Sequence, residues 1–235
     1  MKKFYSVAAT AQSGELYTVE LDGRPIKTPA KTPFLVPTRA LADAIALEWH
    51  GQEEEIDQHS MMLTGLAYTA IDRMPMHRLD VIDEVSAYAD TDLLCYPAES
   101  PRELVAKQRA AWQPLLDWAA DTLGIELVVA TGLAPVKHPA PSLAAARKQV
   151  EGCDNFVLAA LDRLTHISGS LVVALAIREG HTDPADAYDL AHLEEHWQAE
   201  KWGTDAEAEH RHTDRKKQMQ AAHNFIQLSG EISAE

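Results

Sequence analysis

The chain has 235 residues, of which 46% are hydrophobic and 24% charged, a composition typical of a soluble globular protein and not of a disordered one. Its formal net charge is −15, which disfavours binding to nucleic-acid phosphates and to anionic membrane surfaces. Its two cysteines, Cys95 and Cys153, are too few for a disulfide framework or a cysteine-rich zinc site, so we expect both to be free core residues.

The first forty residues are predicted to be rich in β-structure. Residues 4–7 and 16–21 combine aromatic and β-branched side chains, and the second run alternates apolar with polar positions. Asp22-Gly23 then supplies a pair that readily adopts the positive φ angles of a tight hairpin turn. The prolines that follow, Pro25, Pro29 and Pro33, confine the next pieces to sheet edges or irregular chain.

Helices are predicted from Thr38 onwards, because this residue is a good N-cap and is followed by apolar residues at helical spacing. Further helices are expected over 62–71, 79–88 and about 101–123. Residues 92–96 and 125–129 are short apolar runs and are predicted to be strands on either side of the long helix. Beyond Pro141 the pattern is helical, with segments at about 142–151, 154–164, 166–179, 184–202 and 205–228.

This shift from β-rich to helical sequence predicts an α+β fold of two domains. We expect an N-terminal mixed, β-rich domain over residues 1–90 and a C-terminal helical bundle over 91–235, while residues 92–137 could belong partly to the first domain. The longest apolar stretch is too short to cross a bilayer, and no targeting segment opens the sequence. We therefore expect a cytoplasmic protein that does not insert into membranes.

The string that most resembles an active site runs from His192 to His196 and contains Glu194 and Glu195. Its H-x-x-E-H pattern is that of an inverted zinc-protease motif, so a zinc-dependent hydrolase using His192, Glu195 and His196 is one hypothesis. A helical wheel instead puts both histidines on a polar arc and Glu195 on a second stripe with Tyr188 and Trp202. That arrangement favours a carboxylate that contacts a partner or closes an internal ion pair, with no metal and no catalytic residue.

A second string, residues 21–29, is not explained by local structure alone. A hairpin turn accounts for Asp22 and Gly23. It does not require Arg24 and Lys27 beside two prolines.

Several strings, taken together and in order, resemble one family, the chaperones that bind the α subunit of F-type ATP synthase during assembly of its catalytic head. The resemblance covers nearly the whole chain. It is carried by Lys3-Phe4-Tyr5, residues 21–29, Val36-Pro37-Thr38, Glu48-Trp49, Met62-Leu63-Thr64, Thr69-Ala70-Ile71-Asp72, residues 90–96, residues 115–119 with Trp112, and residues 193–198 with Trp202-Gly203.

The resemblance implies a chaperone and not an enzyme, one that works without a cofactor and holds newly made α subunit before that subunit meets its β partner. A subunit built for a ring exposes an interface that must be covered until the ring closes. Since eukaryotic members carry a mitochondrial targeting segment, the chain resembles a bacterial, cytoplasmic member, and we expect a monomer. The resemblance points to Glu194, Glu195, Gln198 and Trp202 as client-binding residues.

Overall fold

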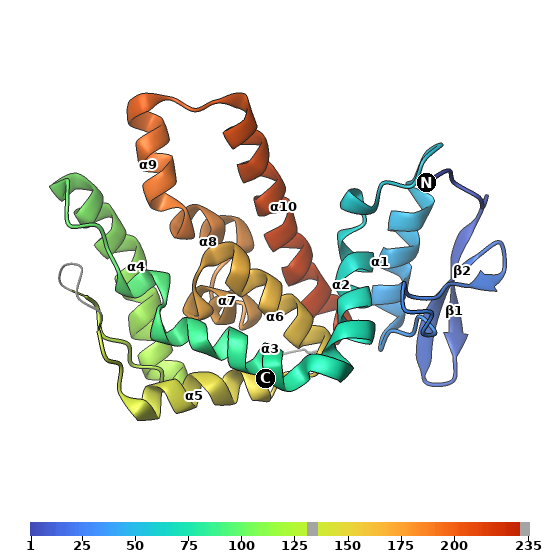
Figure 1. Cartoon of the computed structure of the whole chain (residues 1–235), viewed down its shortest axis with the longest axis horizontal. Helices are drawn as coiled ribbons and strands as arrows, with labels where there is room; N and C mark the ends of the chain where they lie inside the picture. The colour runs from blue at the N-terminus through green and yellow to red at the C-terminus, as the bar shows by residue number, and fades with distance from the viewer. Residues whose placement is uncertain (131–135, 231–235) are drawn as a thin grey trace. The chain divides into compact units, whose positions relative to one another are not determined.

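The computed structural model describes residues 1–130 and 136–230, and it contains a small antiparallel sheet near the N-terminus and helices through most of the remainder (Figure 1). This confirms the predicted α+β class. The chain packs as two compact units, one made of Met1–Arg78, Asp154–Ala160 and Ala221–Glu235, the other of Leu79–Cys153 and Leu161–Gln220. A domain boundary between residues 90 and 91 stays a prediction. No helix in the described residues is both long and apolar enough to cross a membrane.

The sheet belongs to the first unit and has the order β1-β2-β3, with β1 at Ala8–Ser13, β2 at Leu16–Leu21 and β3 at Arg24–Pro25. The predicted turn at Asp22-Gly23 is present, and both residues have positive φ. The strand expected at residues 4–7 is wrong, because the first strand begins at Ala8. Instead, the Asp22 carboxylate accepts hydrogen bonds from the backbone N–H groups of Ser6 and Val7, which ties the N-terminal segment to the turn.

Helix α1, Arg39–His50, packs its apolar side against this sheet. Thr38 is its N-cap, as predicted, and accepts a hydrogen bond from Leu41 N–H at 3.1 Å. Glu48 near the end of α1 accepts hydrogen bonds from Leu63 and Thr64 N–H, so one helix caps the start of the next. The elements that follow are a 3₁₀ turn at Gln58–Ser60, α2 at Met62–Tyr68, a π-helical turn at Thr69–Arg73 and α3 at Met74–Ala87.

Two later segments complete the core of the first unit. They come from the start of α6, Asn155–Ser168, and from the end of α10, Ala206–Ser229. Phe156 and Phe225 stack with ring centroids 6.0 Å apart, and the Thr38 hydroxyl donates a hydrogen bond to the Leu228 carbonyl oxygen. Residues 1–78 therefore share their core with chain that is synthesised much later.

The second unit is helical and is built around α7, Leu171–Arg178, in which every residue up to Ile177 is buried. Helix α4, Arg102–Leu123, packs against α7 and ends at Gly124, whose φ of +69° is the left-handed conformation that glycine adopts at helix ends. Trp112 and Leu115 on α4 are buried. The other helices of this unit include α5 at Ala140–Glu151, α8 at Pro184–Ala191 and α9 at Leu193–Trp202.

The strands predicted on either side of α4 are not present. Leu93–Cys95 is a 3₁₀ turn, and residues 125–129 have no regular secondary structure. Asp92 explains the first difference, because its fully buried carboxylate accepts hydrogen bonds from Leu94 N–H and from Val172 N–H, both at 3.1 Å. These contacts cap the 3₁₀ turn and anchor it to α7, so the strand–helix–strand prediction for residues 92–129 is wrong.

Candidate functional site

The helix predicted over 184–202 is broken at His192, which separates α8 from α9. Its backbone, at φ −102° and ψ 22°, leaves the helical region. The His192 ring is 6% exposed, stacks on the Tyr188 ring at 4.0 Å, and places Nδ1 3.0 Å from the Tyr188 carbonyl oxygen. The helical wheel drawn through this break is therefore wrong, and His192 lies in the interior and not on a polar arc.

Helix α9 carries the four residues predicted to contact a client, and all four are exposed. Glu194, Gln198 and Trp202 recur every four residues, which places them along one side of the helix. The Gln198 amide donates a hydrogen bond to the Glu194 carboxylate at 3.2 Å. Trp202 is 75% exposed, and its ring meets the buried Trp197 ring edge-on at 5.9 Å. We call Glu194, Glu195, Gln198 and Trp202 the α9 face.

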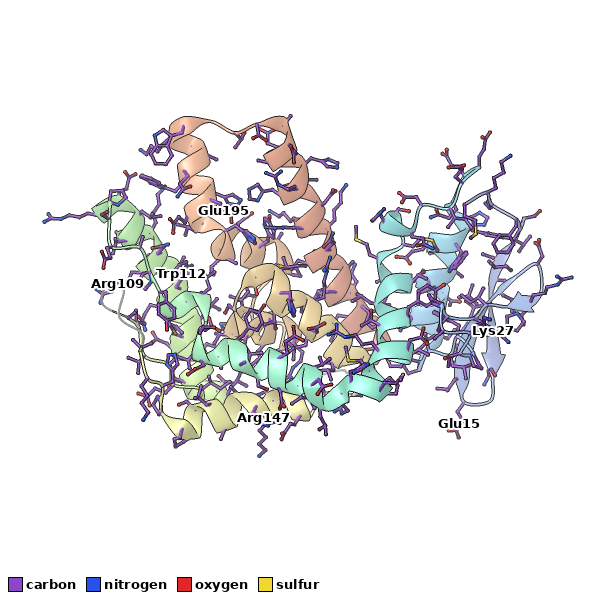
Figure 2. All side chains as sticks on the ribbon, viewed as in Figure 1. Glu15, Lys27, Arg109, Trp112, Arg147 and Glu195 are labelled. Carbon is purple, nitrogen blue, oxygen red and sulfur yellow. The ribbon has the colours of Figure 1, made fainter. Side chains whose placement is uncertain are left out.

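Glu195 points toward the neighbouring helix α10, as Figure 2 shows. Its Oε2 lies 3.4 Å from Nε2 of His212, and Nδ1 of His212 lies 2.7 Å from the Tyr188 hydroxyl. The continuous stripe predicted through Tyr188, Glu195 and Trp202 is wrong, because the helix breaks at His192 and Tyr188 is 1% exposed, whereas Glu195 and Trp202, two turns apart on α9, both lie at the surface. Glu195 is instead the outermost member of a polar chain that runs inward through His212.

Sequence reasoning did not identify His212 as the partner of Glu195. The contact depends on the turn after α9, where Gly203 has a φ of +84° and α10 returns beside α9 (Figure 1). A glycine directly after an amphipathic helix signals that the helix ends there. It does not give the direction in which the next helix leaves, so the pairing could not be read from spacing.

The groups beneath Glu195 are kept uncharged by burial. Burial raises the pKa of the Tyr188 phenol to about 12, so this hydroxyl stays protonated. Burial also lowers the pKa of His192, which favours its neutral ring. The Glu195 side chain is about half exposed, so the negative charge of the site lies at its outer surface.

Three histidines gather here without forming a metal centre. The ring of His212 lies 5.9 Å from that of His192 and 5.3 Å from that of His196, centroid to centroid. In the part of the chain that the structure describes, no three histidine, cysteine or acidic side chains converge on a point that a metal ion could occupy. The zinc hydrolase hypothesis built on His192, Glu195 and His196 therefore has no support in the geometry.

Helices α8 and α9 are attached to α4 by contacts of two kinds. The indole N–H of the buried Trp112 donates a hydrogen bond to the Leu190 carbonyl oxygen at 3.0 Å (Figure 2). Further along, two ion pairs join exposed side chains at 3.7 Å, one between Lys107 and Glu200 and the other between Lys201 and Glu103. Such surface pairs contribute little stability, so the buried tryptophan is the principal anchor.

With this geometry described, comparison with known proteins gives the family. The family model described as ATP12 chaperone protein matches residues 2–120, just over half of the chain. The chain belongs to the ATP12 chaperone family. This confirms the resemblance inferred from the sequence, and with it the function of a chaperone for ATP synthase assembly.

Individual relatives agree with this membership. Protein atp12, mitochondrial, from Schizosaccharomyces pombe is 29% identical over 216 residues, which cover 86% of this chain and 74% of that protein. The crystal structure of Atp12 from Paracoccus denitrificans is 37% identical, with a TM-score of 0.91 and coverage of 97% of this chain and 98% of that one. The Atu1473 protein of Agrobacterium tumefaciens is 38% identical, with a TM-score of 0.92 and coverage of 96% and 85%. The ATP12-family fold thus extends over almost the whole chain.

Proposed function

We propose that this ATP12-family chain captures the unassembled α subunit of F-type ATP synthase on the α9 face and releases it to the next subunit. It does so as a monomer in the bacterial cytoplasm, by binding alone and without a chemical step or a cofactor. The proposal is supported by the family and by the exposed, acidic and aromatic character of α9.

The observation that carries the proposal is the exposure of Trp202. Tryptophan is enriched among the residues that dominate protein interfaces, because it combines a large apolar surface with few rotatable bonds. Trp202 is 75% exposed and stands against the buried Trp197 ring. This contact supports the indole from behind while it presents its other surface to solvent.

The carboxylates around Trp202 add a preference for a cationic partner. Glu194 and Glu195 both face solvent, and neither carboxylate lies within 4 Å of a lysine or arginine in the described chain. A cationic group on the client would be attracted to these carboxylates, whereas an acidic client surface would be repelled by them. The α9 face would then cover apolar client surface and hold it in register through these charges.

Charge reversal at Glu195 tests the proposal. Because the Glu195 side chain is about half exposed and its contact with His212 is long, we expect Glu195→Lys to melt within about 3 °C of the unchanged protein. We expect the same variant to lose capture of purified α subunit in a pull-down, because attraction to a cationic client group becomes repulsion.

A matched control separates a local effect from a change in net charge. Asp121→Lys makes the same charge change at an exposed site on α4 and should capture α subunit as well as the unchanged chain. Lost capture together with a collapsed melting transition would make Glu195 a structural residue. Retained capture by Glu195→Lys would remove it from the client contact.

A further inference from the structure

A cleft lies in the first unit beside Arg24 and Lys27, the two cations that the hairpin turn does not account for. This cleft of about 500 Å³ opens between the N-terminal segment, the turn that joins β2 to β3, and α1. Phe4, Tyr5 and Trp49 form a row of aromatic rings along it, with successive centroids 5.4 and 5.7 Å apart. Its volume is within the range of sites that hold small ligands or short peptide segments.

The aromatic lining is fixed before any partner binds. Tyr5 is 7% exposed, and its hydroxyl donates a hydrogen bond to the Trp49 carbonyl oxygen at 2.6 Å. The Lys3 ammonium lies 5.1 Å from the centre of the Tyr5 ring and donates to the Gln52 carbonyl oxygen at 2.7 Å. Binding of a partner therefore costs little conformational entropy in these side chains, because they are already ordered.

Only the outermost ring is available for a large new contact. Phe4 is 66% exposed, whereas Trp49 is 7% exposed. Exposing a phenylalanine at the mouth of an aromatic cleft is unfavourable unless an apolar group covers it. The occupant should therefore bring a large apolar side chain.

The rim of the cleft is positively charged. Arg24 and Lys27 are exposed, and within residues 1–130 and 136–230 neither side chain forms an ion pair or hydrogen bond (Figure 2 labels Lys27). Asp22, the acidic residue in the lining of the cleft, is already hydrogen-bonded to the Ser6 and Val7 N–H groups, and the Asp72 carboxylate accepts hydrogen bonds from the Thr28 hydroxyl and Ala30 N–H. Two unpaired cations in a chain of net charge −15 indicate a carboxylate-bearing partner.

Two other kinds of occupant fit poorly. A long polyanion such as a nucleic acid would be repelled by the net charge of −15, whereas a short acidic segment feels mainly the cations within a screening length of about 8 Å. A strand added to the sheet is excluded on this side because β3 has only two residues and Pro25 has no N–H to donate. Recognition here must work through side chains.

We infer that this cleft binds a short acidic segment of a partner protein in which carboxylates flank a large apolar side chain. The apolar side chain packs against Phe4 at the mouth of the cleft, and the carboxylates pair with Arg24 and Lys27. The site lies in the first unit and uses none of the residues of the α9 face. It therefore goes beyond the proposed capture of the α subunit and does not depend on it.

Fluorescence anisotropy with a labelled peptide of sequence Glu-Glu-Leu-Phe-Glu-Glu tests the inference on the full chain. We expect the double variant Arg24→Glu/Lys27→Glu to weaken binding at least about tenfold, because both attractions become repulsions. Both residues are exposed, so the fold should be retained. The control Lys148→Glu/Lys217→Glu makes the same charge change at exposed sites of the second unit and should bind within about twofold of the unchanged chain.

Two further comparisons separate the apolar from the charged part. Phe4→Ser changes an exposed residue without altering charge and should also weaken binding several-fold. A peptide with serine in place of leucine and phenylalanine should bind at least about tenfold more weakly than the original. Equal binding of the two peptides would overturn the inference and leave a simple anion site.

The remaining outcomes are equally decisive. No saturable binding of the acidic apolar peptide, or equal losses in the double variant and its control, would also overturn the inference. Glu195→Lys should bind the peptide as the unchanged chain does, so loss of α-subunit capture and loss of this site are distinguishable. Retained peptide binding with no α-subunit capture by the unchanged chain would refute only the proposed function.

Discussion

His192, which lies at the break between α8 and α9, is a buried side chain that makes the stability of the protein depend on pH. Its ring is 6% exposed and stacks on the Tyr188 ring one turn earlier, with ring centroids 4.0 Å apart. Burial lowers its pKa, the Tyr188 carbonyl oxygen and Glu195 act in the opposite direction, and the charges of Arg215 and His212 lower the pKa further. The folded chain therefore holds this histidine neutral at pH values where the unfolded chain would protonate it.

The sign of the resulting pH dependence follows from proton uptake. Below the ordinary histidine pKa of about 6.5 the unfolded state binds the proton more readily, so His192 stabilises the fold above that pH and the contribution is lost as the pH falls. His192→Phe keeps a stacked ring but cannot titrate. We expect its melting temperature to fall less than that of the unchanged chain when the pH is lowered from about 7.5 to about 5.5.

Circular dichroism melts at both pH values measure this effect. The exposed His59→Phe is the matched control and should show the pH dependence of the unchanged chain. Equal losses in all three proteins would mean that His192 does not contribute to the acid sensitivity.

At the scale of elements, α4 is anchored by Trp112. The indole is 3% exposed, and its N–H donates a hydrogen bond to the Leu190 carbonyl oxygen at the end of α8. Trp112→Ala should lower the free energy of unfolding by about 3–5 kcal/mol, the usual cost of emptying a core position of this size. Urea denaturation followed by circular dichroism would measure the change.

A companion variant separates packing from hydrogen bonding at this position. Trp112→Phe keeps most of the apolar volume and leaves the Leu190 carbonyl oxygen without its donor, so its cost should be smaller than that of alanine. A loss below about 1 kcal/mol for Trp112→Ala would place α4 outside the core.

The helical nature of the chain beyond residue 140 could be predicted because its apolar stripes persist over several turns, but the boundary between α6 and α7 and the break at His192 could not. The secondary structure of short apolar runs could not be predicted in this way. Residues 92–96 fit a strand or a helical turn equally well, and the choice is made by hydrogen bonds that the Asp92 carboxylate accepts, one of them from Val172 N–H, 80 positions away. In the candidate site, too, local features could be predicted and long-range contacts could not. The exposure of Trp202 agrees with a surface role, whereas the pairing of Glu195 with His212 depends on a turn whose direction the sequence does not specify.

At the scale of the whole molecule, the first unit is assembled from three separate stretches of chain. Phe225 and Ile226 are fully buried in it, although they lie more than 140 residues after Arg78. We expect a fragment of residues 1–90 to melt at a lower temperature than the full chain, and less cooperatively, because it lacks these side chains. Thermal melts of the fragment and the full chain make the comparison. An equally sharp transition at the same temperature would show that residues 1–90 fold independently, in favour of the proposed boundary.

The bond between the Thr38 hydroxyl and the Leu228 carbonyl oxygen also has a consequence for biosynthesis. A ribosome delivers Thr38 early and Leu228 near the end of the 235 residues, so the N-cap of α1 exists long before one of its partners. Nascent domains generally fold in order from the N-terminus. Here the N-terminal unit must wait for residues 221–229 before its core is complete, and during translation the chaperone itself exposes an unfinished apolar surface.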